Sequence, residues 1–236
     1  MSAIAIIPAH IKSTTIPQKN LALIGGKPMV WWTINAAVES GVIDRIFVST
    51  DGKEIADIAT KMDAEVLWRP QDFIDRSATI RLDEIIAYHL KVDKLEGDPV
   101  VLLQPTSPFR DAEDIRGAMN LFHVKQADCV FSAIPQGHFL WVMNATNQGP
   151  QPIYRPEARK NRQQLKDWVW ENGAIYITRR AIWDKLGQRV MSTPKAYAYM
   201  MSKLHSLEVD EPEDLELARM LCGDREQECV SSISTA

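Results

Sequence analysis

IAIIPAHIKSTTIPQKNLALIGGKP, residues 4–28, decides the fold of this 236-residue chain. Its first four residues form an apolar run that is typical of a buried strand. The run ends at Pro8 in a polar loop that closes with the segment IPQKN, residues 16–20. In open α/β sheets, ligands bind at loops that follow strand carboxyl ends, and basic loops there hold phosphates. The stretch therefore predicts a nucleotide-binding loop, with a purely structural turn as the alternative.

Short apolar runs and amphipathic stretches alternate through most of the chain. This alternation predicts an α/β fold in which a mostly parallel sheet is covered on both faces by helices, giving three layers. The expected strands are 4–7, 45–49, 64–67, 100–104 and 174–177, and the expected helices are 28–40, 53–62, 81–90, 112–122, 180–186 and 212–220.

The regular pattern weakens between about residues 134 and 168, where glycines, prolines and basic residues collect. We read this segment as an excursion from the sheet. Because no linker or repeat separates it from the rest, residues 1–222 are expected to form a single domain. The polar residues 223–236 are expected to form a flexible tail.

Composition narrows the classes of partner. The formal net charge of −4, from 31 acidic and 27 basic residues, gives no overall attraction to nucleic acid or to an anionic membrane surface. No apolar stretch approaches the roughly 20 residues that span a bilayer, and the start lacks the order of a secretory signal, so we expect a cytoplasmic protein. The three cysteines lack metal-ligand spacing, and Cys129, in an apolar run, is expected in the core.

Five segments of the chain, in order, resemble the CMP-N-acylneuraminate synthetase (acylneuraminate cytidylyltransferase) family. They are IIPA with IPQKN (6–9 and 16–20), VSTD (48–51), LQPTSPFR (103–110), ENGAIYI (171–177) and VDEPEDL (209–215). The resemblance implies a Rossmann-like nucleotidyltransferase with a small dimerisation lobe at 134–168, and hence a homodimer. It also implies transfer of CMP from CTP to an acidic sugar, such as a nonulosonic or sialic acid, with release of pyrophosphate.

Both reactants are anionic, so the site needs cations, backbone N–H groups and a divalent metal around the triphosphate. Lys19 is the first candidate for phosphate contact and catalysis. The resemblance implies a nucleotide site of Ala9, His10, Lys12, Ser13, Lys19, Asn20, Arg69 and Ser77. The loop 10–15 reads HIKSTT where the family reads RGGSKG, so the family's glycines, its arginine and its lysine are missing from their positions. His10 is therefore either a weak phosphate ligand or an ordinary loop histidine. Asp51 either faces the nucleotide or caps the next helix.

For the acceptor, the resemblance points to Gln104, Arg110, Arg162 and Asn172. An amide and a guanidinium suit the hydroxyls and carboxylate of a sugar acid. The alternative for Arg110 is a surface ion pair with Asp111 or Glu113. Glu208 and Asp210 alternate along an extended segment and point to one side. The family holds Mg²⁺ with Asp-x-Asp here, so both carboxylates are expected metal ligands, with Asp210 preferred and also catalytic.

Two alternatives remain open at this point. One is a cytidylyltransferase for another anionic acceptor, such as a different sugar acid or a phosphonate. The other is a non-catalytic homologue that binds nucleotide or sugar, which the missing loop glycines favour because β-branched residues restrict the backbone.

Overall fold

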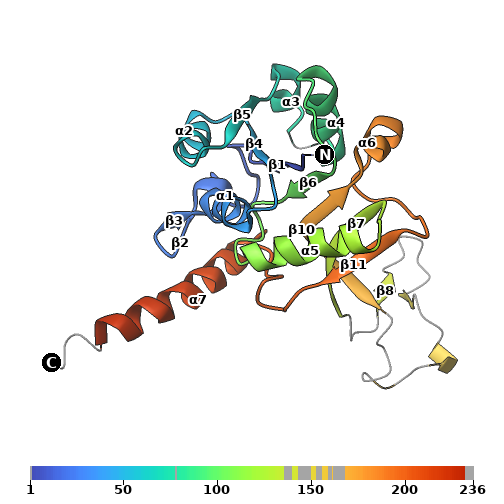
Figure 1. Cartoon of the computed structure of the whole chain (residues 1–236). Helices are drawn as coiled ribbons and strands as arrows, with labels where there is room; N and C mark the ends of the chain where they lie inside the picture. Colours follow the sequence, from blue (N-terminus) through green and yellow to red (C-terminus); the bar gives the residue numbers. More distant parts are fainter. Residues whose placement is uncertain are drawn as a thin grey trace.

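A seven-stranded sheet forms the centre of the protein (Figure 1). The computed structural model describes residues 2–77, 79–135, 140–142, 150–152, 156–158, 161 and 168–231. The strand order is β11-β7-β10-β6-β1-β4-β5. All neighbours are parallel except β10, which runs antiparallel to both β6 and β7. The strands are β1 (Ile4–Pro8), β4 (Arg45–Thr50), β5 (Glu65–Trp68), β6 (Val100–Leu103), β7 (Cys129–Pro135), β10 (Val169–Thr178) and β11 (Ala196–Met200).

Helices cover both faces of the sheet and bury its alternating side chains. On one face, Val48 and Val101 pack in one core cluster with residues of α1 (Met29–Ser40), α2 (Lys53–Lys61) and α5 (Ala112–Val124). On the other face, Phe47 and Leu102 pack with residues of α4 (Leu82–Val92) and α6 (Arg180–Leu186). This arrangement confirms the predicted three-layer, Rossmann-like α/β fold. Cys129 is fully buried, as expected.

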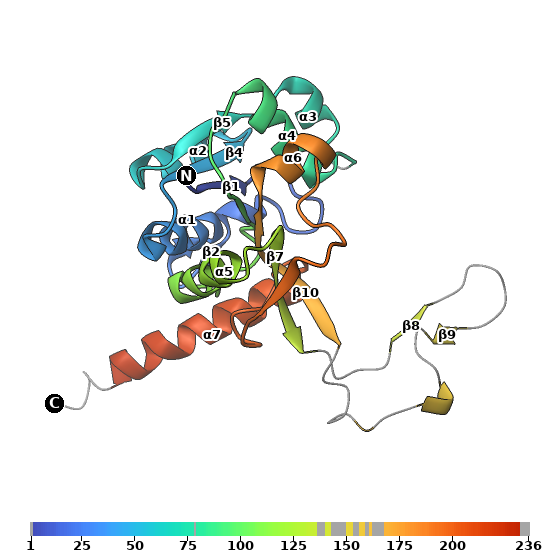
Figure 2. The ribbon, with the colours of Figure 1, turned by 45° about the vertical axis from the view of Figure 1, so that its right-hand side comes forward.

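A third, smaller core joins the two ends of the chain. Ile16 of the first loop packs with Ile24, Val209 and the start of α7 (Pro212–Ser231). Ile24 belongs to a short hairpin of β2 (Leu23–Ile24) and β3 (Lys27–Pro28), and η1 (Lys19–Leu21) precedes it. From this core, α7 projects away from the body of the protein (Figures 1 and 2). The helix runs well past the predicted end at residue 220, and the flexible tail over 223–236 stays a prediction, with 232–236 outside the described residues.

Several other differences from the predicted elements lie around the irregular segment. Strand β10 begins at Val169 instead of near residue 174, and its register against β7 shifts between Glu171 and Tyr176. Within the segment, β8 (Trp141–Val142) pairs with β9 (Gln151–Pro152) as a separate two-stranded sheet, and η2 (Pro156–Ala158) follows. Helix α3 (Gln71–Asp75) and strands β7 and β11 were not predicted. None of the helices in the described ranges combines the length and apolar character needed to cross a membrane.

Candidate functional site

The first loop, residues 9–18, is fixed to the carboxyl end of β4. The Ala9 N–H donates to the Ser49 carbonyl at 2.8 Å, and the Ile11 N–H donates to Asp51 Oδ1 at 2.7 Å. Gly52 lies so close to the Ile11 side chain that a Cβ there would be 2.9 Å from it. Asp51 therefore anchors the loop. The capping alternative is wrong, because Gly52 precedes α2 and no side chain caps that helix.

The far end of the loop is tied to the segment that precedes α7. Thr15 Oγ1 donates to the Asp210 carbonyl at 2.6 Å, and Lys19 Nζ lies 2.7 Å from Asp210 Oδ1. The Lys19 side chain is only 14% exposed, whereas Asp210 is 53% exposed. Asn20 Nδ2 donates to the His10 carbonyl at 2.8 Å and so holds the loop against itself. Lys19 is therefore an oriented, largely buried cation.

Two adjoining cavities open at this edge of the sheet. We call the first the loop cavity; it measures about 1020 Å³ and is lined by His10, Ile11, Lys12, Ser13, Thr14, Thr15, Gln18, Lys19, Ser77, Asp210 and Glu211. We call the second the strand-end cavity; it measures about 210 Å³ and is lined by Pro8, His10, Lys19, Asn20, Arg69, Ser77, Ile80, Leu82, Ile85, Gln104, Pro105 and Thr106.

The structure gathers most of the predicted nucleotide residues around these cavities. His10, Lys19 and Ser77 line both of them. Ala9 differs from the rest, because its side chain is buried in the core and its N–H already bonds to the sheet. A nucleotide contact through Ala9 stays a prediction.

Burial lowers the pKa of two residues in the strand-end cavity. Burial, followed by the charge of Arg69, lowers the pKa of His10, so this histidine is neutral at neutral pH. The His10 Nδ1 atom is buried and has no hydrogen-bond partner among the described residues. Burial also lowers the pKa of Arg69 to about 10, and Asp51 opposes that shift, so Arg69 keeps its positive charge. The site thus holds Lys19 and Arg69 as fixed cations beside a neutral His10.

Glu208 and Asp210 form the acidic side of the site. Burial, followed by repulsion from Asp210, raises the pKa of Glu208 to about 7, although Lys19 acts against it. Glu208 Oε1 lies close to Gly173, since a Cβ on this glycine would be 3.3 Å from the Glu208 oxygen. Two crowded carboxylates of this kind suit a hard divalent cation, which binds oxygen ligands and relieves their repulsion. The pair therefore fits the metal that the sequence predicts.

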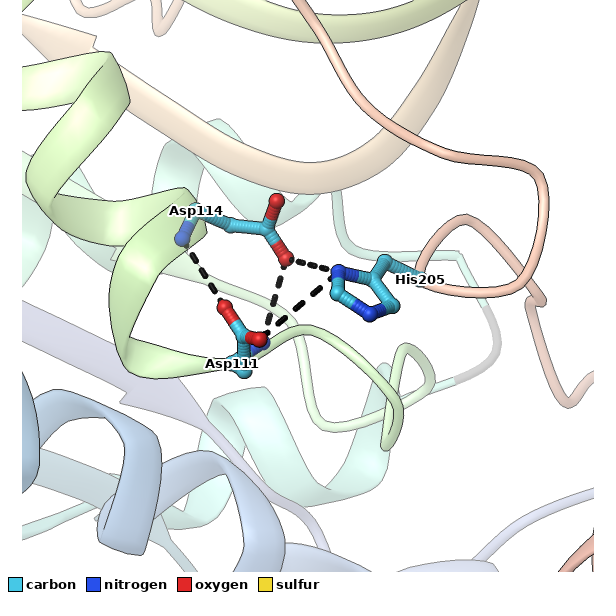
Figure 3. Close-up of side chains that lie close together, drawn as sticks. All are labelled: Asp111, Asp114 and His205. Atoms are coloured by element: carbon cyan, nitrogen blue, oxygen red, sulfur yellow. Dashed lines mark hydrogen bonds and ion pairs between the residues drawn. The ribbon is translucent and has the colours of Figure 1, made fainter.

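A second acidic cluster, Asp111, Asp114 and His205, lies at the start of α5 (Figure 3). The two aspartates form a capping box, since each side chain accepts from the other's backbone N–H. Asp114 Oδ2 also accepts from His205 Nδ1 at 2.7 Å. N–H donors therefore already hold these carboxylates, and the cluster fixes the helix start.

The residues predicted to bind the sugar acceptor are divided between the strand-end cavity and the protein interior. Gln104 lines the strand-end cavity and donates from Nε2 to the Gly173 carbonyl at 2.8 Å. Arg110 is only 2% exposed, and its Nη1 donates to the carbonyls of Gln104 and Ala174. It lines a separate cavity of about 260 Å³ and is not a surface partner of Asp111 or Glu113, so that alternative is wrong.

Asn172 is also an interior residue. Its Oδ1 accepts from Ser132 Oγ at 2.5 Å and from the Ala174 N–H, and its Nδ2 donates to Ser206 Oγ at 2.7 Å. A contact between Asn172 and the acceptor would require these bonds to break. Arg162 lies outside the described residues.

Three polar residues behind the cavity were missed by the sequence analysis. Ser49 Oγ lies 2.8 Å from His89 Nε2, and His89 Nδ1 lies 2.6 Å from Asp93 Oδ2. The only sequence signal is a histidine on the inward face of the helix at 81–90, a position more often filled by an apolar core residue.

Comparisons with known proteins identify the family of the chain. Residues 4–232 match the family described as Cytidylyltransferase. N-acylneuraminate cytidylyltransferase of Streptococcus agalactiae serotype V is 32% identical over 222 residues, covering 91% of this chain and 52% of that protein. CMP-N,N'-diacetyllegionaminic acid synthase of Legionella pneumophila is 32% identical over 230 residues, covering 94% of this chain and 96% of that protein.

The chain thus spans about half the length of the Streptococcus relative and nearly all of the Legionella relative. A solved structure, CMP:2-keto-3-deoxy-manno-octonic acid synthetase complexed with CTP, has a TM-score of 0.70 at 19% identity, covering 95% of this chain and all of that one. This likeness shows a shared fold. Since the family match extends over nearly the whole chain and is supported by a full-length relative, the chain belongs to the cytidylyltransferase family.

Proposed function

We propose that the protein transfers CMP from CTP to an acidic sugar of the nonulosonic or sialic acid class and releases pyrophosphate. The observation that carries this proposal is the position of Lys19, a largely buried cation that lines both cavities and is paired with Asp210. Family membership supports the nucleotide, and two relatives named for N-acylneuraminate and diacetyllegionaminic acid support the acceptor class.

In this proposal the triphosphate occupies the loop cavity. Lys19 and the exposed Lys12 face the phosphates, and Arg69 and Ser77 hold the nucleoside beside the strand ends. A fixed cation stabilises negative charge that develops on the α-phosphate during attack by the sugar oxygen, and it needs no rearrangement at that moment. The partly buried, neutral His10 contributes a hydrogen-bonding ring instead of a charge.

Glu208 and Asp210 hold the proposed metal, Mg²⁺. The ion, when bound, supplies positive charge to the phosphate oxygens. Lys19 Nζ and Asp210 Oδ1 are paired at 2.7 Å, and in this proposal Lys19 exchanges that oxygen for a phosphate oxygen, which leaves both Asp210 oxygens to the metal. We infer that binding of the nucleotide and of the metal favour each other through this exchange.

The acceptor is proposed to bind next to Gln104, which is oriented by Gly173. A second subunit is proposed to contribute Arg162 of the excursion 134–168. Exposed aromatic side chains in and next to that region support a homodimer, since Trp141 within it and Trp170 just after it are each about half exposed. A cytoplasmic location remains part of the same proposal.

Pyrophosphate release by the purified protein, measured over a panel of nucleotides and sugar acids with Mg²⁺, tests the proposal. We expect release only with CTP and an acidic sugar. Release with a different anionic acceptor would establish the first alternative. CTP binding without release for any acceptor would favour a non-catalytic binding protein, which the altered loop at 10–15 keeps as the second candidate.

A further inference from the structure

A chain of hydrogen bonds runs from the strand-end cavity into the protein. Arg69 Nε donates to Ser49 Oγ at 3.1 Å, and Arg69 Nη2 donates to the Ser49 carbonyl at 3.4 Å. Ser49 Oγ then contacts His89 Nε2, which is 2.8 Å away. His89 Nδ1 ends the chain on Asp93 Oδ2 at 2.6 Å. Hydrogen bonds thus connect four side chains one to the next. They come from β4, from α4 and from the segments that follow β5 and α4.

The protons in this chain have one consistent arrangement. The Arg69 guanidinium is only a donor, so the Ser49 hydroxyl accepts from it and must direct its own proton elsewhere. An ionised Asp93 only accepts, so His89 carries its proton on Nδ1 and presents Nε2 as an acceptor to Ser49. Burial lowers the pKa of His89, and although Asp93 opposes this, Arg69 adds to it, so the ring is neutral.

The resemblance to a hydrolytic Ser-His-Asp arrangement does not extend to its chemistry. Ser49 and His89 have no exposed surface, and the Ser49 hydroxyl oxygen already accepts from Arg69. A substrate would have no path to this oxygen. The effect of these hydrogen bonds is therefore on Arg69. Its side chain lines the strand-end cavity together with His10, Lys19 and Asn20.

We propose that Ser49, His89 and Asp93 are positioning residues that hold the Arg69 guanidinium in the orientation that binds the nucleotide. This inference rests on the proposed function. Two hydrogen bonds from one guanidinium to Ser49 restrict the rotation of an otherwise flexible side chain. A side chain that is ordered before binding avoids an entropic cost when the ligand arrives. We call the hydrogen-bonded series Asp93–His89–Ser49–Arg69 the relay. Its residues Ser49, His89 and Asp93 raise the affinity for CTP without contacting the nucleotide.

Asp93 provides a variant that preserves the fold, because it lies at the surface after α4. Asp93→Ala removes the acceptor for His89 Nδ1 and leaves its tautomer undefined. Asp93→Asn retains an oxygen acceptor and should restore the relay. Glu96→Ala is the matched control. It removes one exposed carboxylate from the same segment between α4 and β6 and leaves the four hydrogen-bonded side chains unchanged.

The experiment is calorimetric titration of CTP into the full chain, with each variant made in the native and in the Arg69→Ala background. His89→Leu and Asp93→Ala should weaken CTP binding about two- to tenfold, while Asp93→Asn and Glu96→Ala stay near the native affinity. In the Arg69→Ala background the same changes should have no further effect, because coupled residues are not additive. Native affinity in both His89→Leu and Asp93→Ala, or an equal loss in both backgrounds, overturns the relay.

A second measurement separates this inference from the proposed function. Hydrogen exchange of the Arg69 Nε–H, followed by NMR in the free protein, should be slow in the native chain and clearly faster in Asp93→Ala. If the native chain binds no CTP while this acceleration is seen, the proposed function fails and the positioning of Arg69 stands. If exchange is unchanged in Asp93→Ala, the relay is refuted whatever the protein binds.

Discussion

Replacing Lys19 with alanine tests the phosphate grip of the first loop directly. A charge-assisted hydrogen bond to phosphate is worth about 1.5 to 3 kcal/mol, with a midpoint near 2.2. Lys19 must first leave Asp210, but that pair contributes only about 0.5 kcal/mol because half of the Asp210 side chain faces solvent. The difference of about 1.7 kcal/mol predicts that Lys19→Ala weakens CTP binding roughly eighteenfold.

Calorimetric titration of CTP with Mg²⁺ at pH 8 measures this effect. Lys61→Ala, at the exposed end of α2, removes the same charge away from the loop and serves as the matched control. His10→Ala should change the affinity far less than Lys19→Ala, because burial lowers the pKa of His10 and leaves the ring uncharged. An unchanged affinity in Lys19→Ala would refute the reasoning, and the non-catalytic alternative would then become the preferred one.

Three further outcomes are expected. Asp210→Ala and a chelator should each remove most pyrophosphate release with little change in melting temperature; full release in chelator would disprove the metal assignment. Light scattering should give about twice the chain mass of 26.7 kDa, and a monomer at micromolar concentration would exclude the dimer. The stability of the native chain relative to His89→Leu, measured by denaturant unfolding, should decrease as the pH falls below about 6.5. The folded pKa of His89 is lowered, so the unfolded chain binds the proton first. A difference that does not change with pH would contradict a buried neutral histidine.

The sequence predicts those parts of the fold that local patterns encode. Alternating apolar runs locate β1, β4 and β6, and helical periodicity locates α1, α2 and α5 with slightly shifted ends. The antiparallel direction of β10 and the pairing of β7 with β11 depend on contacts between distant segments, which no local pattern carries. Part of β10 was predicted as a strand at 174–177, but its direction and the pairing of β7 with β11 are seen only in the folded chain.

The site shows the same division. Lys19, Glu208 and Asp210 are identified from short motifs, and the structure brings them together. The interior position of Arg110 is not encoded locally, because an arginine before two acidic residues also suits an exposed ion pair. His89 is hidden for the opposite reason, since one polar residue on an apolar helix face does not disturb the pattern of a core helix.

The hydrogen bond from Thr15 to the carbonyl of Asp210 joins residues that are 195 positions apart in the chain. A contact of such long range carries a large loop-closure cost, which packing of the intervening sheet must offset first. The first loop therefore cannot reach its final shape while the chain is still being synthesised as far as β10. Assembly of this edge is a late step of folding, and a polypeptide that stops short of residue 210 would have a formed sheet but a first loop that lacks its anchor at Thr15 and Lys19.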